Sequence, residues 1–108
     1  MATPRPLAIG LLHVGPGASL SLRERTAARV HLALAVNERG YALIETFELG
    51  MGAVADDVAM AHVEELAVGH DVQVLVLMGD VDEARIQRLA DRARLALWTP
   101  DLASGSVS

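Results

Sequence analysis

The stretch Asp71-Val-Gln-Val-Leu-Val-Leu-Met-Gly79 decides the fold. It is apolar apart from Asp71, Gln73 and the closing glycine, and most of its apolar side chains are valine and leucine. A continuous run of this kind is typical of a strand buried on both faces, as in a parallel sheet covered by helices. We therefore predict that this stretch is the central strand of an α/β fold.

The segments on either side predict alternating strands and helices. The expected strands are 7–14, 41–47 and 95–98, and the expected helices run from a Ser19 or Ser21 cap to about Arg39, over 53–68, and onward from Asp80. Gly40 and Gly69 stand where the first two helices should stop. Strand-helix alternation with right-handed crossovers predicts an α/β, three-layer, doubly wound parallel sheet of about four strands. The usual order is flavodoxin-like, with the second strand outside the first and the third on its other side.

Composition limits the class of protein. A chain of 108 residues fits one domain, and we expect the polar ends, 1–6 and 101–108, to be frayed tails. The absence of cysteine excludes disulfides and thiolate zinc sites. The N-terminus does not resemble a signal peptide, and no apolar run approaches the roughly 20 residues of a membrane span. We therefore expect a cytoplasmic protein without membrane contact.

The charge balance bears on nucleic-acid binding. The formal net charge is -5, the chain contains no lysine, and its nine arginines are spread over the predicted helices. Phosphate contacts need clustered cationic side chains, and such binding weakens steeply with salt. We therefore expect no specific binding to DNA or RNA.

The order of elements resembles a known family. A strand, a serine-containing loop, a long helix, a strand opened by Gly40-Tyr41, a second helix, Gly69-His-Asp71 and an apolar strand together resemble the serine recombinase (resolvase) catalytic domain. The likeness covers about residues 7–98, and its best-matched parts are 40–45 and 58–79. The resemblance implies a resolvase-like, flavodoxin-like fold.

The same resemblance implies that the chemistry is lost. The family's first strand ends in an Arg-Val-Ser pattern that carries the nucleophile, whereas the matching residues here are His13-Val14-Gly15. The family arginine at the start of the second helix falls on Asp57, and its Asp-Arg-Leu-x-Arg signature falls on Gly79-Asp-Val-Asp-Glu83. Cationic positions have become anionic, so we expect no catalytic residues and no enzymatic activity.

The sequence contains two other candidate sites. The Gly15–Ser19 loop, at a strand-to-helix turn, could cradle a phosphate or another small ligand, which is the alternative function. Leu20 breaks the glycine-rich spacing, and there is no Walker lysine. His62 and Glu65 could share a metal ion, but no third ligand has a recognisable spacing. We therefore expect neither a metal nor a cofactor.

The first helix has an unusually wide apolar arc. On a helical wheel, Val30 and Leu34 define one apolar face, and Leu22, Leu32 and Val36 extend the arc beyond what covering a sheet requires. We predict a homodimer through this helix, with Leu22, Leu32 and Val36 at the interface; a core position for Leu32 is the alternative. The preferred interpretation is thus a catalytically inactive resolvase-like domain that acts as a protein-association module. A recombinase relic without a selected role is a third interpretation.

Overall fold

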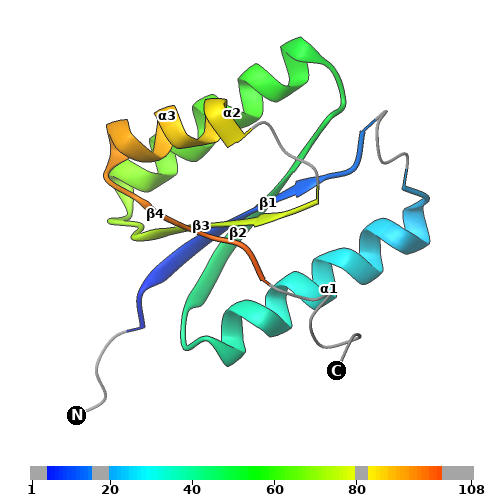
Figure 1. The fold of residues 1–108 in the computed structure, drawn as a ribbon, viewed down its shortest axis with the longest axis horizontal. Helices are drawn as coiled ribbons and strands as arrows, with labels where there is room; N and C mark the ends of the chain where they lie inside the picture. Colours follow the sequence, from blue (N-terminus) through cyan, green and yellow to red (C-terminus); the bar gives the residue numbers. More distant parts are fainter. Residues whose placement is uncertain (1–4, 16–19, 80–82, 101–108) are drawn as a thin grey trace.

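Four strands and three helices alternate along the chain. The computed structural model describes residues 5–15, 20–79 and 83–100. The elements are β1 (Leu7–His13), α1 (Leu22–Glu38), β2 (Ala42–Leu49), α2 (Ala53–Gly69), β3 (Val74–Met78), α3 (Glu83–Ala93) and β4 (Ala96–Trp98) (Figure 1). This is the order of elements that the sequence predicts.

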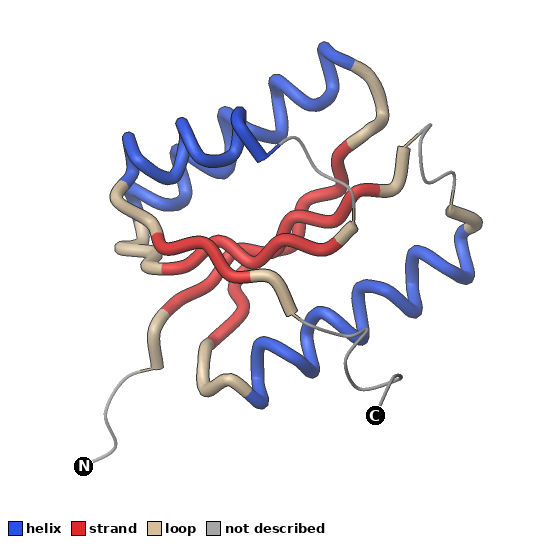
Figure 2. The backbone as a smooth tube through the Cα atoms, viewed as in Figure 1, coloured by secondary structure: helices blue, strands red, loops and turns tan. Residues whose placement is uncertain are grey.

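The four strands form one parallel sheet in the order β2-β1-β3-β4. The strands, red in Figure 2, lie between the helices. The second strand lies outside the first and the third lies on its other side, so the predicted doubly wound α/β fold is confirmed. The connection from β1 leads outward to β2, and the next connection passes back over β1 to β3. The direction in which strands are added therefore changes between β1 and β3. In sheets of this type, ligands bind beyond the carboxyl ends of the strands at such a reversal.

The sheet separates two hydrophobic cores. Helices α2 and α3 cover one face and α1 covers the other (Figure 1). The larger core, under α2 and α3, is built around Ile9, Leu75 and Leu77. The smaller core, under α1, contains Ala8, Val74 and Val76. The central strand β3 thus supplies buried side chains to both faces, as its continuous apolar sequence predicts.

Local signals set several element boundaries. Ser21 caps α1 in a reciprocal capping box with Glu24, and Gly40 adopts a φ of +89° just beyond the helix. The central strand begins at Val74 rather than at Asp71, because Asp71 has a φ of 54° and belongs to the turn that follows α2. Its apolar neighbour Val72 is nevertheless buried in the larger core.

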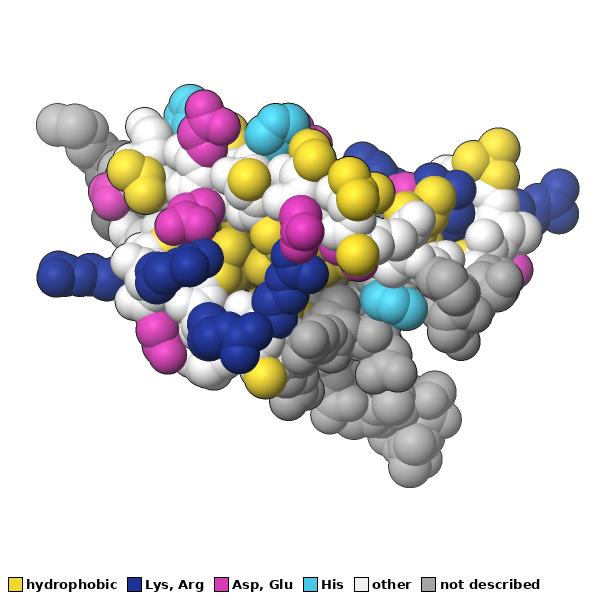
Figure 3. Space-filling view, turned by 90° about the horizontal axis from the view of Figure 1, so that it is seen from above, with side chains coloured by type: hydrophobic (Ala, Val, Ile, Leu, Met, Phe, Trp, Pro, Cys, Tyr) yellow, Lys and Arg dark blue, Asp and Glu magenta, His cyan; other side chains and the backbone are white. Residues whose placement is uncertain are grey.

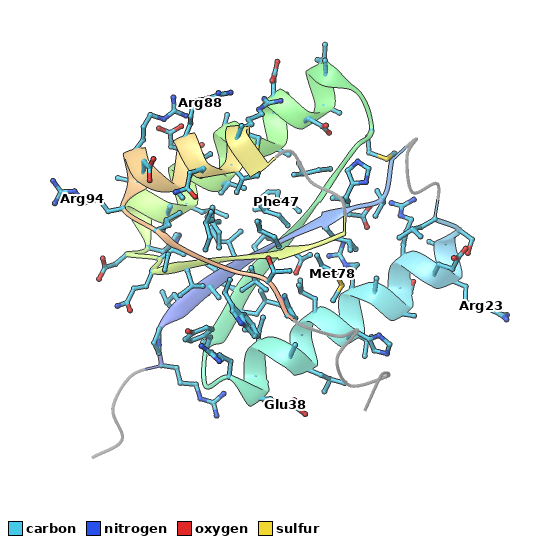
Figure 4. All side chains as sticks on the ribbon, in the orientation of Figure 1. Arg23, Glu38, Phe47, Met78, Arg88 and Arg94 are labelled. Atoms are coloured by element: carbon cyan, nitrogen blue, oxygen red, sulfur yellow. The ribbon has the colours of Figure 1, made fainter. Side chains whose placement is uncertain are left out.

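Strand β2 is an edge strand with a bulge. Leu43 lies opposite Ala8 and Glu45 lies opposite Ile9, so Ile44 is an extra residue in β2. The bulge changes which side chains face each helix layer. Beyond it, Glu48 points toward α1, where it meets two arginines, and Phe47 packs against the core under α2 (Figure 4).

Helix α1 packs closely onto the sheet, and this corrects part of the predicted interface. A Cβ added at Gly10 of β1 would lie 2.3 Å from Cδ2 of Leu32, so the missing side chain allows Leu32 to reach the backbone of β1. Leu32 and Val36 are both fully buried, with 0% exposure. Their assignment to a dimer interface is therefore wrong. Leu22, at the start of the helix, is 75% exposed.

The described ends of the chain are tied to the domain. Of the predicted N-terminal tail, the Pro6 carbonyl accepts a hydrogen bond from Ala42 N at 2.8 Å, and Arg5 donates to Asn37 Oδ1 at 2.7 Å. The rest of that tail and residues 101–108 lie outside the described residues. Within the described ranges, no helix combines the length and apolar character that a bilayer crossing requires.

Candidate functional site

The carboxyl edge of the sheet brings glycine turns together. Gly15 follows β1, Gly50 follows β2, and Gly79 follows β3. The first two turns touch: Val14 N donates to Leu49 O at 2.8 Å, and a Cβ added at Gly15 would lie 1.5 Å from the carbonyl oxygen of Gly50. The position that the resemblance assigns to the nucleophile therefore has no room for a side chain.

His13 is the side chain that these turns enclose. A Cβ at Gly50 would lie 2.7 Å from His13 Nε2, and one at Gly79 would lie 3.1 Å from His13 Cβ. Both glycines have a φ close to +90°, which residues with a side chain rarely adopt. His13 Nδ1 is buried and has no hydrogen-bond partner within the part of the chain that is described. In the sequence, His13 stands out only as part of the segment that matches the family's Arg-Val-Ser pattern. Its enclosure between two turns was missed, because it depends on residues far apart in the chain.

The helices that follow the first two turns, α1 and α2, each have a carboxylate bonded to backbone N–H groups at the N-terminus. Glu24 Oε1 accepts from Ser21 N at 3.1 Å, and this backbone hydrogen bond, together with the Ser21 side chain, lowers the pKa of Glu24. Asp56 of α2 accepts from Gly50 N at 2.9 and 3.1 Å and from Met51 N at 3.3 Å. Among the described residues of this edge, the N–H groups of Ser21, Gly50 and Met51 are thus bonded to the protein's own acids rather than open to a phosphate. Of the predicted phosphate loop, Gly15–Ser19, residues 16–19 lie outside the described residues.

Two arginines of α1 converge on one carboxylate of β2. Arg25 and Arg29 both form ion pairs with Glu48, the second at 3.1 Å between Nη1 and Oε2. Burial of Glu48 raises its pKa, but the hydrogen bonds and positive charges of Arg25 and Arg29 together outweigh burial, so the pKa is lowered overall. These two cations neutralise an internal acid, which leaves them poorly placed to bind an external phosphate.

This ion-pair cluster makes stability depend on acid pH. Because the pKa of Glu48 is lower in the folded state than its usual value near 4.5, its contribution is fully present above that value. The contribution is lost as the pH falls through the lowered pKa of the folded state. We expect the free energy of unfolding, measured with urea at a series of pH values, to decline below about pH 4.5. Glu48→Gln should lower stability at pH 7 and flatten this decline; an identical pH profile in the variant would contradict the assignment.

The positions that match the family's other cationic residues hold acids or lie outside the described residues. Asp57 forms an ion pair with Arg85 of α3, and its side chain remains 67% exposed. Residues 80–82 of the second acidic segment lie outside the described residues. The described part of the edge therefore offers His13 and internally paired charges, without a serine at the end of β1.

A groove lies between the edge strand β2 and helix α2. This groove of about 490 Å³ is lined by Glu45, Phe47, His62, Glu65 and His70, among others. His62 and Glu65, the pair considered as metal ligands, therefore do share one surface, and the His62 ring lies 6.3 Å from that of Phe47. Among the described residues, however, no group of three or more potential ligands is arranged to hold a metal ion.

The outer face of α1 is the remaining candidate. Leu22, Val30 and Leu34 are 75%, 51% and 55% exposed, although each has a large apolar side chain. The predicted interface residues Leu22, Leu32 and Val36 therefore do not share a surface, because two of them face the sheet. Helical spacing places Val30 and Leu34 on the opposite side of α1 from Leu32 and Val36. It does not show which of the two sides the sheet covers.

Known proteins give no further assignment. No family model and no curated protein matches this chain. The resemblance to serine recombinases is therefore neither supported nor contradicted by relatives.

Proposed function

We propose that this chain is a non-catalytic, resolvase-like α/β domain that works by associating with other copies of itself through the outer face of α1. The observation that carries the proposal is the exposure of Val30 and Leu34 on a helix whose opposite face already fills the core with Leu32 and Val36. Contiguous apolar surface on a small domain commonly marks an interaction site. Burying this face against another copy of the chain removes it from water.

The carboxyl edge supports the non-catalytic part of this proposal. The Gly50 carbonyl occupies the space that a side chain at position 15 would need. Arg25 and Arg29, in the first half of α1, are paired with Glu48. Stabilising a phosphodiester transition state requires cationic groups aimed at the reacting phosphate. Within the described ranges, no serine stands at the end of β1, and Arg23, the remaining arginine of α1, extends away from the sheet (Figure 4).

The proposed association predicts a concentration-dependent mass. We expect the wild type to self-associate in sedimentation velocity experiments as its concentration is raised. Leu34→Glu should remain folded by circular dichroism but sediment as a monomer, because a charge in a desolvated contact is costly unless paired. Gln73→Glu is the matched control, since it adds the same charge at an exposed position at the amino end of β3. A wild type that stays monomeric at millimolar concentration would end the proposal.

Ligand binding at the carboxyl edge is the second candidate function. The observation in its favour is His13, whose buried Nδ1 lacks a partner beside the reversal between β1 and β3. A small ligand with one hydrogen-bonding group would fit this site better than a phosphate, because Glu24 and Asp56 already hold nearby N–H groups. Shifts of the His13 resonances on addition of inorganic phosphate would favour the phosphate form of this function instead.

A further inference from the structure

Helix α2 presents a second apolar ridge, on the opposite side of the sheet from α1. We define the α2 stripe as Val54, Val58, Ala61, Glu65 and Val68, whose spacings of four, three, four and three residues follow one side of a helix. Its three valines are 79%, 54% and 76% exposed. Apolar side chains run along this side of the molecule in Figure 3, which views it from above α2.

The outer face of α1 has the same spacing. We define the α1 stripe as Arg23, Ala27, Val30, Leu34 and Asn37, and all five side chains are exposed. Arg23 extends away from the sheet into solvent (Figure 4). Each stripe thus contains apolar residues and a single charged residue, a cation in α1 and an anion in α2. Repeats of alternating three and four residues are the pattern with which two helices pack side by side.

We infer that the α1 stripe of one copy packs antiparallel against the α2 stripe of the next copy. This inference rests on the proposed function, since it names the surface that the outer face of α1 meets. With Val30 placed opposite Ala61, the larger side chain faces the smaller one. Leu34 then faces Val58, and Asn37 lies at the level of Val54.

The same alignment pairs the two charges. Arg23 lies within about one helical turn of Glu65 in the neighbouring copy, a distance that an arginine side chain spans. Neither Arg23 nor Glu65 has an ion-pair partner among the described residues of its own chain. A charge at the seam of two helices specifies which partners and orientations are tolerated. The charges therefore favour a contact between an α1 stripe and an α2 stripe.

A contact between two identical stripes would leave either a charge unneutralised or apolar side chains in water. Two α2 stripes in contact would bring Glu65 against valine or against the second Glu65, where no cation of the seam can neutralise it. Two α1 stripes in contact would leave Val54, Val58 and Val68 of both copies in water. Only the contact between α1 and α2 covers both stripes and pairs both charges.

Because the two stripes lie on opposite faces of the sheet, one such contact leaves a free stripe at each end. Contacts between different surfaces produce rings or open chains of copies rather than closed pairs. Each stripe belongs to a 17-residue helix of about 25 Å. A contact of this size belongs to the class of small, reversible interfaces. We expect assemblies that grow with concentration and dissociate on dilution.

A complementation experiment on the full chain tests this contact. Leu34→Glu disables only the α1 stripe, and Val58→Glu disables only the α2 stripe. Each variant alone should be a folded monomer in sedimentation velocity. An equimolar mixture should form a one-to-one complex that does not grow further, because one intact α1 stripe meets one intact α2 stripe. Gln73→Glu, mixed with either variant, is the control for added charge.

The outcomes separate this inference from the proposed function. If Val58→Glu associates like the wild type while Leu34→Glu is monomeric, α1 pairs with itself; the inference fails and the proposed function stands. If both variants are monomeric and their mixture is also monomeric, the inference fails as well. A wild type that stays monomeric would contradict both the inference and the proposed function.

A charge exchange tests the alignment independently. Arg23→Glu and Glu65→Arg should each weaken self-association by about fivefold, because each places like charges together at the seam. The double variant should recover most of the wild-type affinity, since it restores an opposite pair with reversed polarity. Losses that simply add in the double variant would overturn the proposed alignment.

Discussion

Leu32→Glu is expected to unfold the domain. Leu32 is fully buried and contacts the backbone of β1 through the space left by Gly10. Removing a buried leucine side chain costs about 2–5 kcal/mol, and an unpaired carboxylate in its place adds the cost of burying a charge. Small domains are stable by only about 5–15 kcal/mol. Loss of helical circular dichroism at 25 °C, or a large fall in the urea midpoint, would be the measured result.

Leu34→Glu provides the comparison for this prediction. It introduces the same charge two residues further along α1, at a side chain that is 55% exposed. The two variants should therefore differ in kind, with one unfolded and the other folded and monomeric. A folded Leu32→Glu variant that merely loses self-association would show that the sheet-facing side of α1 has been assigned incorrectly.

Gly15→Ser is expected to destabilise the domain without creating a recombinase. A Cβ at this position meets backbone atoms of Gly50, which cannot rotate away as a side chain can. Forcing atoms into a packed region costs about 1–3 kcal/mol, and a shift of the backbone raises that figure. Urea unfolding should show the loss, and no covalent adduct with DNA should form, because Arg25 and Arg29 remain paired with Glu48.

Gly69→Ser is the matched control for the substitution at Gly15. A Cβ added at Gly69 has no neighbour within 4 Å, so we expect a change of no more than about 0.5 kcal/mol. Equal stabilities for the two serine variants would show that the turn after β2 moves aside at little cost. A trapped protein–DNA adduct in Gly15→Ser would show that the arginines paired with Glu48 can still stabilise a phosphodiester transition state.

The fold could be predicted because its strongest signals are local. The apolar run Val74–Met78, the Ser21 cap and the stop at Gly40 each act through nearby backbone, so the order of elements follows from the sequence. Boundaries that depend on a special dihedral angle were less accurate. Because Asp71 has a φ of 54°, β3 begins at Val74, three residues later than the sequence predicts.

The candidate sites depend on contacts between distant residues, which the sequence does not encode locally. The closeness of Gly15 to Gly50 is set by the pairing of β1 with β2, and the cluster around Glu48 joins residues about 20 positions apart. The error at Leu32 has a similar origin. An apolar arc gives the faces of a helix, whereas the neighbouring glycine at position 10 decides which face the sheet accepts.

The bulge at Ile44 affects how readily the protein aggregates at high concentration. An unbroken edge strand offers a continuous row of peptide groups to other chains and can seed amyloid-like aggregation. In β2 that row is interrupted after Leu43, and at the other edge β4 contains only three residues. Neither margin of the sheet is suited to recruiting a further strand. A domain with apolar helices on both surfaces can therefore be kept concentrated with less danger of irreversible fibre formation.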